Sequence, residues 1–301
     1  MTMAEKMGVK EKTKRVVDNS DNTLALMHKI VYGTLKYLSL IFFSFVALLP
    51  LVSVLITALK NNEEYETTNV MALPKVWNFQ NFADAFTTAN MGQAFLNSGV
   101  ILLFVLVLST FMGTQVAYVL SRFKFRGNGL IHNLFLFATF LPGIAMQVSV
   151  YDIMTKLHLI NHLYGYIIMQ CGTDVISIYV YLQYFENIPI ELDESGIMDG
   201  ANYFQIYKSI LLPLLKPAIV TACILKGVGT YNEYYCANLY LQDKTKLATV
   251  ATSLYTFVGP LGSQYNMICA GVIISLLPAL LIFLLCQKQI YSGLTAGAVK
   301  G

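Results

Sequence analysis

Charged residues are scarce in this chain. Lys, Arg, Asp and Glu together make up 12% of its 301 residues, whereas a typical soluble domain has about 25%. The two signs nearly balance, and the net charge of +3 is too small to indicate a nucleic acid partner. Hydrophobic residues make up 56% of the sequence, and the mean hydropathy is +0.58. This composition excludes an ordinary soluble domain and indicates a membrane protein that lies in a lipid bilayer.

Motifs for nucleotide binding and catalysis are also absent from the sequence. It has no G-x-x-x-x-G-K-S/T motif, so we expect no ATP site in this chain. It has no G-x-S-x-G motif and no histidine–carboxylate set typical of hydrolysis. The five cysteines lack the spacing of metal ligands, and His158 and His162 fall in a short connection with no further ligand nearby. We therefore expect no catalytic residue, metal or cofactor here, and a membrane enzyme is disfavoured.

Long apolar runs dominate what is present. A membrane-spanning helix needs about 20 mainly apolar residues, and six segments qualify. They are residues 37–59, 95–120, 130–151, 163–184, 218–240 and 265–286. Interior prolines, Pro142 among them, are expected to kink their helices. The predicted fold is an all-α polytopic membrane protein with six transmembrane helices.

Lys and Arg predict how the spans are oriented. If the amino terminus is inside, fourteen of the 20 Lys and Arg lie in inside segments, five lie in outside segments, and Lys226 lies within a span. This bias predicts that both termini are cytoplasmic. Residues 1–36 are then a cytoplasmic tail rather than a cleavable signal, and residues 60–94 an extracytoplasmic loop. Residues 95–287 form a five-helix membrane domain, and residues 288–301 a second cytoplasmic tail.

One polar segment, residues 186–217, interrupts the apolar sequence on the predicted cytoplasmic side. Acidic residues favoured by a helix dipole gather where a first short helix begins, and they are Glu191, Asp193 and Glu194. Gly200 suits a turn with positive φ. Asn202 and Gln205 predict a variant capping box that opens a second short helix. The apolar face expected on that helix consists of Tyr203, Ile206, Tyr207, Ile210 and Leu214.

The same segment carries a recognisable pattern. Glu194-Ser195-Gly196, Gly200 and Ile210-Leu211-Leu212-Pro213 follow the order Glu-Ala-Ala, three residues, Gly, nine residues, Ile-x-Leu-Pro. Both alanines differ, and the glycine in the second position is expected to soften the helix. On these residues the chain resembles the membrane subunits of binding-protein-dependent ABC importers. Residues 231–234 and 293–301 resemble the carbohydrate-uptake branch, which contains the MalG-like subunits.

The resemblance implies a function and a set of partners. It implies a permease in the bacterial cytoplasmic membrane that imports a sugar, with an oligosaccharide preferred, by alternating access. The implied partners are a second homologous permease subunit, an extracytoplasmic solute-binding protein and an ATPase subunit dimer, which binds ATP and Mg²⁺. Coupling to the ATPase is assigned to residues of the polar segment, namely Glu191, Glu194, Ser195, Gly196, Asp199, Gly200, Ala201, Ile210, Leu212 and Pro213. The alternative is that the segment is a plain connection between two spans.

Polar residues inside the predicted spans are candidates for the path of the solute. Asp174 and Lys226 fall near mid-depth of consecutive antiparallel spans. We hypothesise that they form an ion pair, and the alternative is that each faces a wet cavity separately. Residues 231–235 combine aromatic rings with an amide and a carboxylate, which suits sugars but also suits an aromatic belt at the membrane surface. The predicted path residues are Gln147, Asp174, Lys226, Tyr231, Asn232, Glu233 and Tyr234.

Other functions share many of these features. A permease of the same fold for an amino acid or a polyamine would carry the same motifs. An ion-coupled secondary transporter would need no ATPase, and Asp174 and Glu233 would carry its protons. In an importer with two different permeases, the second one can also supply most of the solute contacts.

Overall fold

The computed structural model describes the backbone of residues 3–172, 174–259 and 262–298, and within these ranges the side chains of residues 29–287. Part of the predicted tails, residues 1–2 and 299–301, lies outside the described residues. The elements in chain order are α1 (Met3–Ala58), α2 (Asn62–Thr67), α3 (Gln80–Thr88), α4 (Met91–Arg122), α5 (Asn128–Phe140), α6 (Gly143–Lys156), α7 (Leu163–Cys171), α8 (Val175–Glu186), α9 (Glu191–Met198), α10 (Tyr203–Ile206), η1 (Tyr207–Leu211), α11 (Leu212–Leu214), α12 (Lys216–Asn232), α13 (Tyr235–Tyr240), α14 (Val250–Ser253), η2 (Leu254–Phe257), β1 (Val258–Gly259), β2 (Gly262–Ser263) and α15 (Tyr265–Ala298). The two strands pair antiparallel in a short hairpin.

Three of these helices are long and apolar enough to cross a membrane. They are residues 29–58 of α1, the whole of α4, and residues 265–287 of α15. Two further pairs pass the same test only when taken together, and both are bent: α5 with α6 by 105°, and α10–α11 with α12 by 73°. The described chain therefore holds three candidate spans, or up to five if each bent pair is one span. A helical, polytopic membrane fold is confirmed to this extent.

The predicted span at residues 130–151 is divided at a proline. α5 ends at Phe140, and α6 begins at Gly143, directly after Pro142. Proline has no backbone N–H to continue the helical ladder and clashes with the preceding turn. The sequence predicts this break, although the 105° bend is much sharper than an ordinary kink.

Two other predicted spans, residues 163–184 and 218–240, are divided at acidic residues. α7 and α8 part next to Asp174, and α12 and α13 part next to Glu233. Each carboxylate accepts a backbone N–H from the helix that follows, Asp174 from Ser177 at 3.5 Å and Glu233 from Cys236 at 2.9 Å. The prediction of continuous helices was wrong here, because an acid within an apolar segment can stabilise the start of a new helix.

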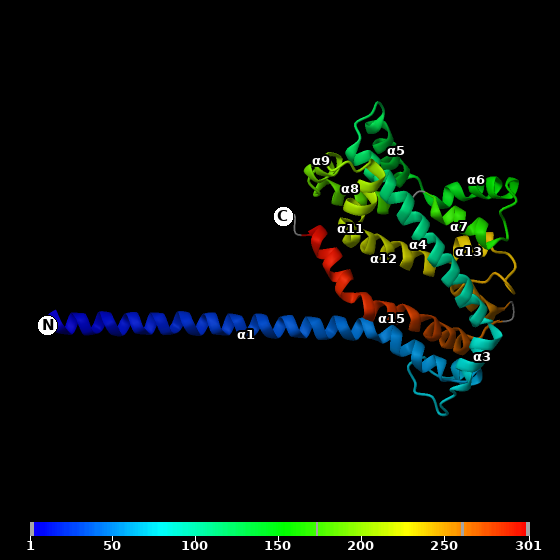
Figure 1. Cartoon of the computed structure of the whole chain (residues 1–301). Helices are drawn as coiled ribbons and strands as arrows, with labels where there is room; N and C mark the ends of the chain where they lie inside the picture. Colours follow the sequence, from blue (N-terminus) through cyan, green and yellow to red (C-terminus); the bar gives the residue numbers. More distant parts are fainter. Residues whose placement is uncertain (1–2, 173, 260–261, 299–301) are drawn as a thin grey trace.

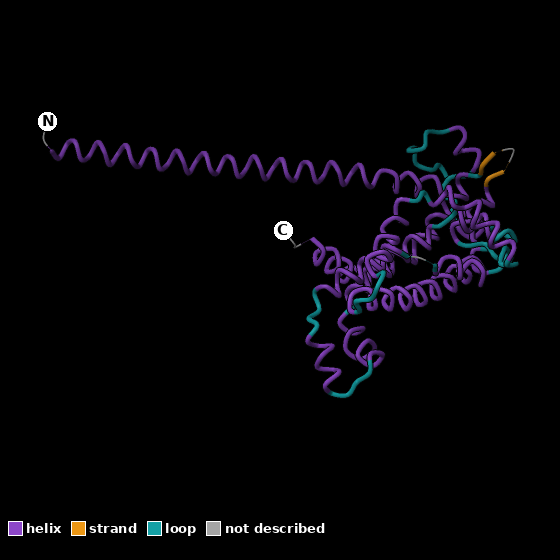
Figure 2. The backbone as a smooth tube through the Cα atoms, turned by 90° about the horizontal axis from the view of Figure 1, so that it is seen from above, coloured by secondary structure: helices purple, strands orange, loops and turns teal. Residues whose placement is uncertain are grey.

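The helices pack around α4, which crosses the body in Figure 1. α4 packs against α7, α8 and α12, and α15 packs against α1, α3 and α12. The amino-terminal part of α1 extends far beyond the body, as the view from above in Figure 2 also shows. α9 lies at one end of the bundle, and α3, α6 and α13 lie toward the other.

The buried core consists of three hydrophobic clusters. The first joins the carboxyl-terminal end of α4 to α8, α12 and residues 186–217, and includes Tyr118, Phe185, Ile206 and Leu211. The second joins α4 to α6, α7 and α13. The third joins the end of α1 to α3 and α15. The polar interruption is thus part of a core rather than a loose connection.

Candidate functional site

Residues 186–217 fold into a compact helical unit, which we name the α9–α11 unit. α9 carries three acids in its first turn, as predicted, and Pro189 lies two residues before the helix. After α9, Gly200 has a φ of +80°, a conformation that glycine adopts without strain. The N–H of Ala201 donates to the carbonyl of Gly196 at 2.9 Å and closes the helix end.

The predicted capping box opens the second half of the unit. The N–H of Gln205 donates to Asn202 Oδ1 at 2.9 Å, and the N–H of Asn202 donates to Gln205 Oε1 at 2.8 Å. Each side chain thus satisfies a backbone group that the start of a helix leaves without a partner. The turn chemistry of this unit is confirmed as the sequence predicts it.

A π-helical turn, η1, changes which residues of the second half are buried. Such a turn adds a residue to the helical repeat and rotates every side chain that follows it. Leu214, a predicted face member that follows the turn, is exposed as a result. Tyr203 precedes the turn, at the first position of α10, and is exposed as well. The residues that are buried are Ile206, Tyr207, Leu211 and Leu215. The predicted apolar face was therefore right at its centre and wrong at both ends.

Gly196 allows α9 to lie close against the second half of the unit. A Cβ on Gly196 would be 2.9 Å from Ile206 Cγ1 and 3.2 Å from Ile210 Cδ1, which is too close for an ordinary contact. The glycine, where the family pattern has alanine, is explained by this packing. Gly196 faces inward and is buried, so its contribution is to the internal packing of the unit.

The outer surface of the unit combines acids with large apolar side chains. Met198 is 86% exposed and Phe204 is 62% exposed, and Ile197 between the acids is also exposed. Of the residues predicted to couple to an ATPase, those exposed on this surface are Glu191, Glu194, Ser195, Asp199, Gly200 and Pro213. Met198 and Phe204 were not predicted from the sequence, although an apolar residue in a polar segment is a signal for a contact surface.

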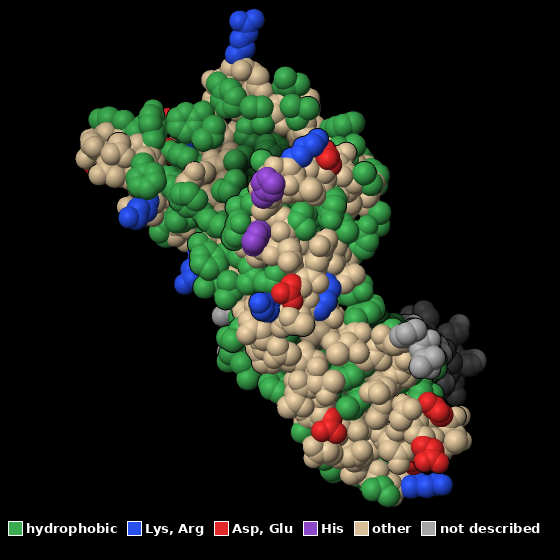
Figure 3. Space-filling view, turned by 90° about the vertical axis from the view of Figure 1, so that its right-hand side faces the viewer, with side chains coloured by type: hydrophobic (Ala, Val, Ile, Leu, Met, Phe, Trp, Pro, Cys, Tyr) green, Lys and Arg blue, Asp and Glu red, His purple; other side chains and the backbone are tan. Residues whose placement is uncertain are grey.

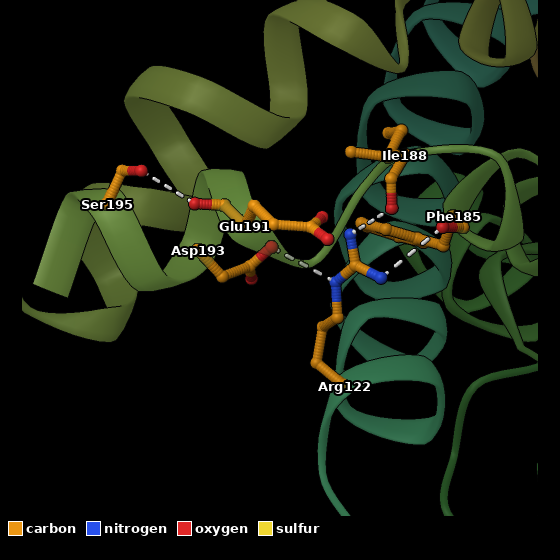
Figure 4. Close-up of polar contacts among 6 residues, drawn as sticks. All are labelled: Arg122, Phe185, Ile188, Glu191, Asp193 and Ser195. Atoms are coloured by element: carbon orange, nitrogen blue, oxygen red, sulfur yellow. Dashed lines mark hydrogen bonds and ion pairs between the residues drawn. The ribbon is translucent and has the colours of Figure 1, made fainter.

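Arg122, the last residue of α4, fastens the unit to the bundle (Figure 4). Its Nε lies 3.2 Å from Asp193 Oδ2 in α9, and the two side chains are only 10% and 11% exposed. Its other nitrogens donate to the carbonyls of Ile188 at 2.8 Å and Phe185 at 3.4 Å, at and beyond the end of α8. Burial raises the pKa of the Asp193 carboxyl above its usual range, although the Arg122 charge opposes this. From the sequence, Arg122 was only one of the basic residues that predict the orientation of the spans.

A cavity of about 250 Å³ lies where the two acid-capped breaks meet. It is lined by residues from α7 and α8 on one side and from α12 and its end on the other. Its polar lining residues are Gln170, Asp174, Ser177, Lys226, Thr230 and Glu233. Lys226, Thr230 and Glu233 are spaced four and three residues apart, the spacing that places side chains on one face of α12, whereas Gln170 and Ser177 lie on either side of the break at Asp174. That spacing was the available signal for Thr230, and none of Gln170, Ser177 and Thr230 was predicted from the sequence.

The hypothesised Asp174–Lys226 ion pair is not formed in this structure. The ion pairs among the described residues are Arg122–Asp193 and Asp152–Lys156. The carboxylate of Asp174 instead accepts hydrogen bonds from Ser177. Asp174 and Lys226 line one polar cavity without pairing, so each faces a cavity as in the alternative, and it is a cavity that they share.

The remaining predicted path residues do not line this cavity and make contacts elsewhere. Gln147 accepts a hydrogen bond from the Tyr240 hydroxyl at 2.8 Å, which ties α6 to α13. The Tyr231 hydroxyl donates to the Ser275 carbonyl at 2.7 Å, which ties α12 to α15. Asn232 is exposed and donates to Val228 within its own helix at 3.0 Å. Tyr234 stacks on Tyr255, with ring centroids 4.0 Å apart.

The end of the bundle that carries α6 and α13 has a weakly charged surface. Figure 3 shows this face, where hydrophobic and uncharged groups predominate and charged side chains are few and scattered. A large patch of one sign is absent from the described part of this face. Charge therefore gives no candidate binding site there.

Comparison with known proteins identifies relatives of nearly the same length. Residues 106–288 match the family described as binding-protein-dependent transport system inner membrane component. The chain is 30% identical to the arabinooligosaccharides transport system permease protein AraQ of Bacillus subtilis (strain 168), over 92% of this chain and 100% of that protein. It is 29% identical to the maltodextrin transport system permease protein MalD of Streptococcus pneumoniae, over 93% of this chain and 100% of that protein.

Two further matches agree with these. The melibiose/raffinose/stachyose import permease protein MelC of Bacillus subtilis (strain 168) is 29% identical, over 84% of this chain and 91% of that protein. Among solved structures, a chain of a bacterial ABC transporter involved in the import of the acidic polysaccharide alginate matches with a TM-score of 0.75. That match has 22% identity and covers 86% of this chain and 96% of that chain, so it shows the shared fold.

Proposed function

Because this chain belongs to the family of inner membrane components of binding-protein-dependent transport systems, we propose that it is a permease subunit of an ATP-driven sugar importer. The substrates in the names of its relatives support a sugar, and oligosaccharides are the preferred class. A permease for an amino acid or a polyamine is the alternative within the same family. This chain supplies part of the path of the solute and the contact with the ATPase, and a separate ATPase subunit hydrolyses ATP.

The proposed assembly has four kinds of subunit. A second, homologous permease packs beside this chain in the bacterial cytoplasmic membrane, and an extracytoplasmic solute-binding protein delivers the sugar. Two ATPase subunits in the cytoplasm bind ATP and Mg²⁺. Six spans with both termini inside follow if α5–α6, α7–α8 and α12–α13 each count as one broken span. Irregular backbone at membrane depth usually lines a cavity or is packed in protein, which supports this count.

The observation that carries the proposal is the form of the α9–α11 unit. Its exposed Met198 and Phe204 stand beside exposed acids, a surface suited to an apolar cleft with a basic rim. Its two halves pack closely at Gly196 and Ile206. A displacement of the surface is therefore expected to move the whole unit rather than to deform it. We propose that this surface docks on the ATPase, and that closure of the ATPase dimer on ATP displaces the unit. The spans then open the path toward the binding protein, and hydrolysis resets them.

The cavity between the broken spans is the proposed place of sugar contact in this chain. Lys226 supplies a hydrogen-bond donor, and the carboxylate oxygen of Glu233 that does not bond to Cys236 supplies an acceptor. Gln170 and Thr230 supply neutral polar groups. Sugar hydroxyls both donate and accept hydrogen bonds, so a mixed lining of this kind suits them. The second permease contacts the rest of the solute, since a cavity of about 250 Å³ is small for a whole oligosaccharide.

The proposal is tested by uptake into vesicles that contain the complete complex. With ATP inside and the solute-binding protein outside, we expect accumulation of a radiolabelled oligosaccharide. Collapse of the proton gradient should leave the uptake unchanged. Uptake of amino acids or polyamines instead of sugars would support the alternative within the family. Uptake that follows the proton gradient and needs no ATP would contradict the proposal.

A further inference from the structure

The side chain of Arg122 links α4, α8 and the α9–α11 unit. The backbone links only some of these parts directly. The backbone leads from α8 into α9, and from α11 into α12. α4 has no such covalent link to the α9–α11 unit, because α5 to α8 intervene in the sequence. Arg122 supplies the link, since its side chain contacts Asp193 in α9 and the carbonyls of Phe185 and Ile188 around the end of α8.

The geometry of this contact is that of a fixed joint. The carbonyls at a helix end have no partner within the helix, and the planar guanidinium reaches two of them while its third nitrogen faces Asp193. The guanidinium carbon also lies 5.8 Å from the centre of the Phe185 ring. A side chain held from several directions leaves α9 little freedom to slide or turn against α4.

Stability alone does not account for this buried ion pair. Moving two charges out of water costs free energy that their attraction recovers only in part. The raised pKa of Asp193 shows that burial outweighs the attraction of Arg122 at this carboxyl. An apolar pair would fill the same space at lower cost, so a defined position is the better explanation for the charges.

A second buried contact joins the unit to α4 further along the helix. The hydroxyls of Thr114 and Tyr207 are 2.8 Å apart, and both side chains are buried. Thr114 lies eight residues before Arg122 in α4, which is about 12 Å along a helix. Two contacts separated along one helix resist rotation as well as sliding, which one contact alone does not.

We propose that Arg122 is a positioning residue that locks the α9–α11 unit to α4 and α8, so that a displacement of the unit moves both helices as one body. The consequence is that force from the unit enters the bundle through α4 as well as through α8 and α12. α4 packs against α7, α8 and α12, which carry the cavity lining. The inference rests on the proposed function, because it concerns how ATPase motion reaches the spans.

The test compares sugar transported per ATP hydrolysed in vesicles that contain the complete complex. Arg122→Met removes the charge and keeps most of the length, and Asp193→Asn removes only the carboxylate charge. We expect complexes that retain the ATPase subunits and hydrolyse ATP, with sugar per ATP lowered about tenfold for Arg122→Met and roughly two- to threefold for Asp193→Asn. The smaller loss follows because Arg122 keeps its two carbonyl contacts in the second variant. Arg126→Met is the matched control, since Arg126 is exposed, and it should behave as the wild type.

Several results would overturn the proposal. One is an unchanged ratio of sugar to ATP in an assembled Arg122→Met complex, and another is an equal loss in Arg126→Met. If Arg122→Met fails to assemble, Asp193→Asn decides, because it removes only the carboxylate charge that faces Arg122 Nε. We expect that variant to lower the ratio roughly two- to threefold, and an unchanged ratio would contradict the joint. A wild-type complex that moves no sugar with ATP would instead contradict the proposed function itself.

Discussion

The α9–α11 unit and the cavity between the broken spans both place charges beside helix ends, but they use them differently. In the unit, Arg122 and Asp193 face each other, and Arg122 also contacts two carbonyls. In the cavity, Asp174 and Glu233 cap the helices that follow them. Lys226 lines the same space, and no hydrogen bond or ion pair of Lys226 occurs among the described residues.

The difference indicates different tasks. Charges with fixed partners define one geometry, which suits a part that must transmit a displacement without deforming. A charge without a fixed partner, next to polar groups in a cavity, can exchange one partner for another as a solute passes. Both arrangements cost free energy when the charges are buried. In the α9–α11 unit the charges contribute rigidity, and in the cavity they contribute recognition of the solute.

The largest effect is expected from a substitution at the turn of the unit. Gly200→Arg places a bulky charge on the docking surface and forces a non-glycine residue to a φ of +80°, so ATP-driven uptake should be abolished while the subunit still inserts. Gly127→Arg is the matched control, because Gly127 has a φ of +102° and open space around it but lies outside the unit. Uptake in vesicles and the amount of inserted protein are measured together. Normal uptake by Gly200→Arg would remove the unit from the coupling mechanism.

A smaller effect is expected in the cavity. Lys226→Met should lower sugar uptake on the order of tenfold, since a lost charge-assisted hydrogen bond costs about 1.5–3 kcal/mol. The ATPase subunits should remain bound, because Lys226 lies away from the unit. The double variant Asp174→Lys with Lys226→Asp should recover nothing, since Asp174 caps α8 and is not paired with Lys226. Recovery of uptake by that exchange would restore the ion pair as the better description.

The smallest effect is expected inside the α9–α11 unit. The change in the free energy of unfolding caused by Gly196→Ala should reverse sign when the side chains that face Gly196 are truncated. Gly196→Ala brings a Cβ to 2.9 Å from Ile206 Cγ1, and such overpacking costs about 1–3 kcal/mol. In an Ile206→Ala, Ile210→Ala background the clash is absent, because both side chains that approach the added Cβ are truncated. The same substitution should then stabilise the protein by about 0.5–1 kcal/mol, because alanine is the better helix former. Thermal unfolding of the four proteins in detergent measures both effects, and a stabilising Gly196→Ala in the wild-type background would contradict the close packing.

Local features were predictable from the sequence because each follows from one short stretch. The turn at Gly200, the capping box of Asn202 and Gln205, and the break at Pro142 depend only on neighbouring residues. The apolar runs likewise predict a polytopic helical membrane protein. The family pattern added the assignment of residues 186–217 to a docking surface, which stays a prediction.

Features that depend on distant residues were not predictable in this way. The contact of Arg122 with Asp193 joins positions 71 residues apart, and hydrophobic periodicity carries no record of such a partner. The π-helical turn shifts the buried face after Ile206, and a fixed period of 3.6 residues misplaces every later residue. Asp174 and Glu233 were taken as charges within continuous spans, because an acid that caps a helix and an acid that interrupts one look the same in the sequence.

The contact of the α9–α11 unit with the ATPase can be measured directly by cross-linking. A photoreactive amino acid in place of Met198, which is 86% exposed, should form a covalent product with the ATPase subunit in the assembled complex. The same amino acid in place of Met71, which is exposed in the connection between α2 and α3, should not. A product with the ATPase from position 198 alone is the predicted result. An assembled, transporting complex without that product would contradict the account.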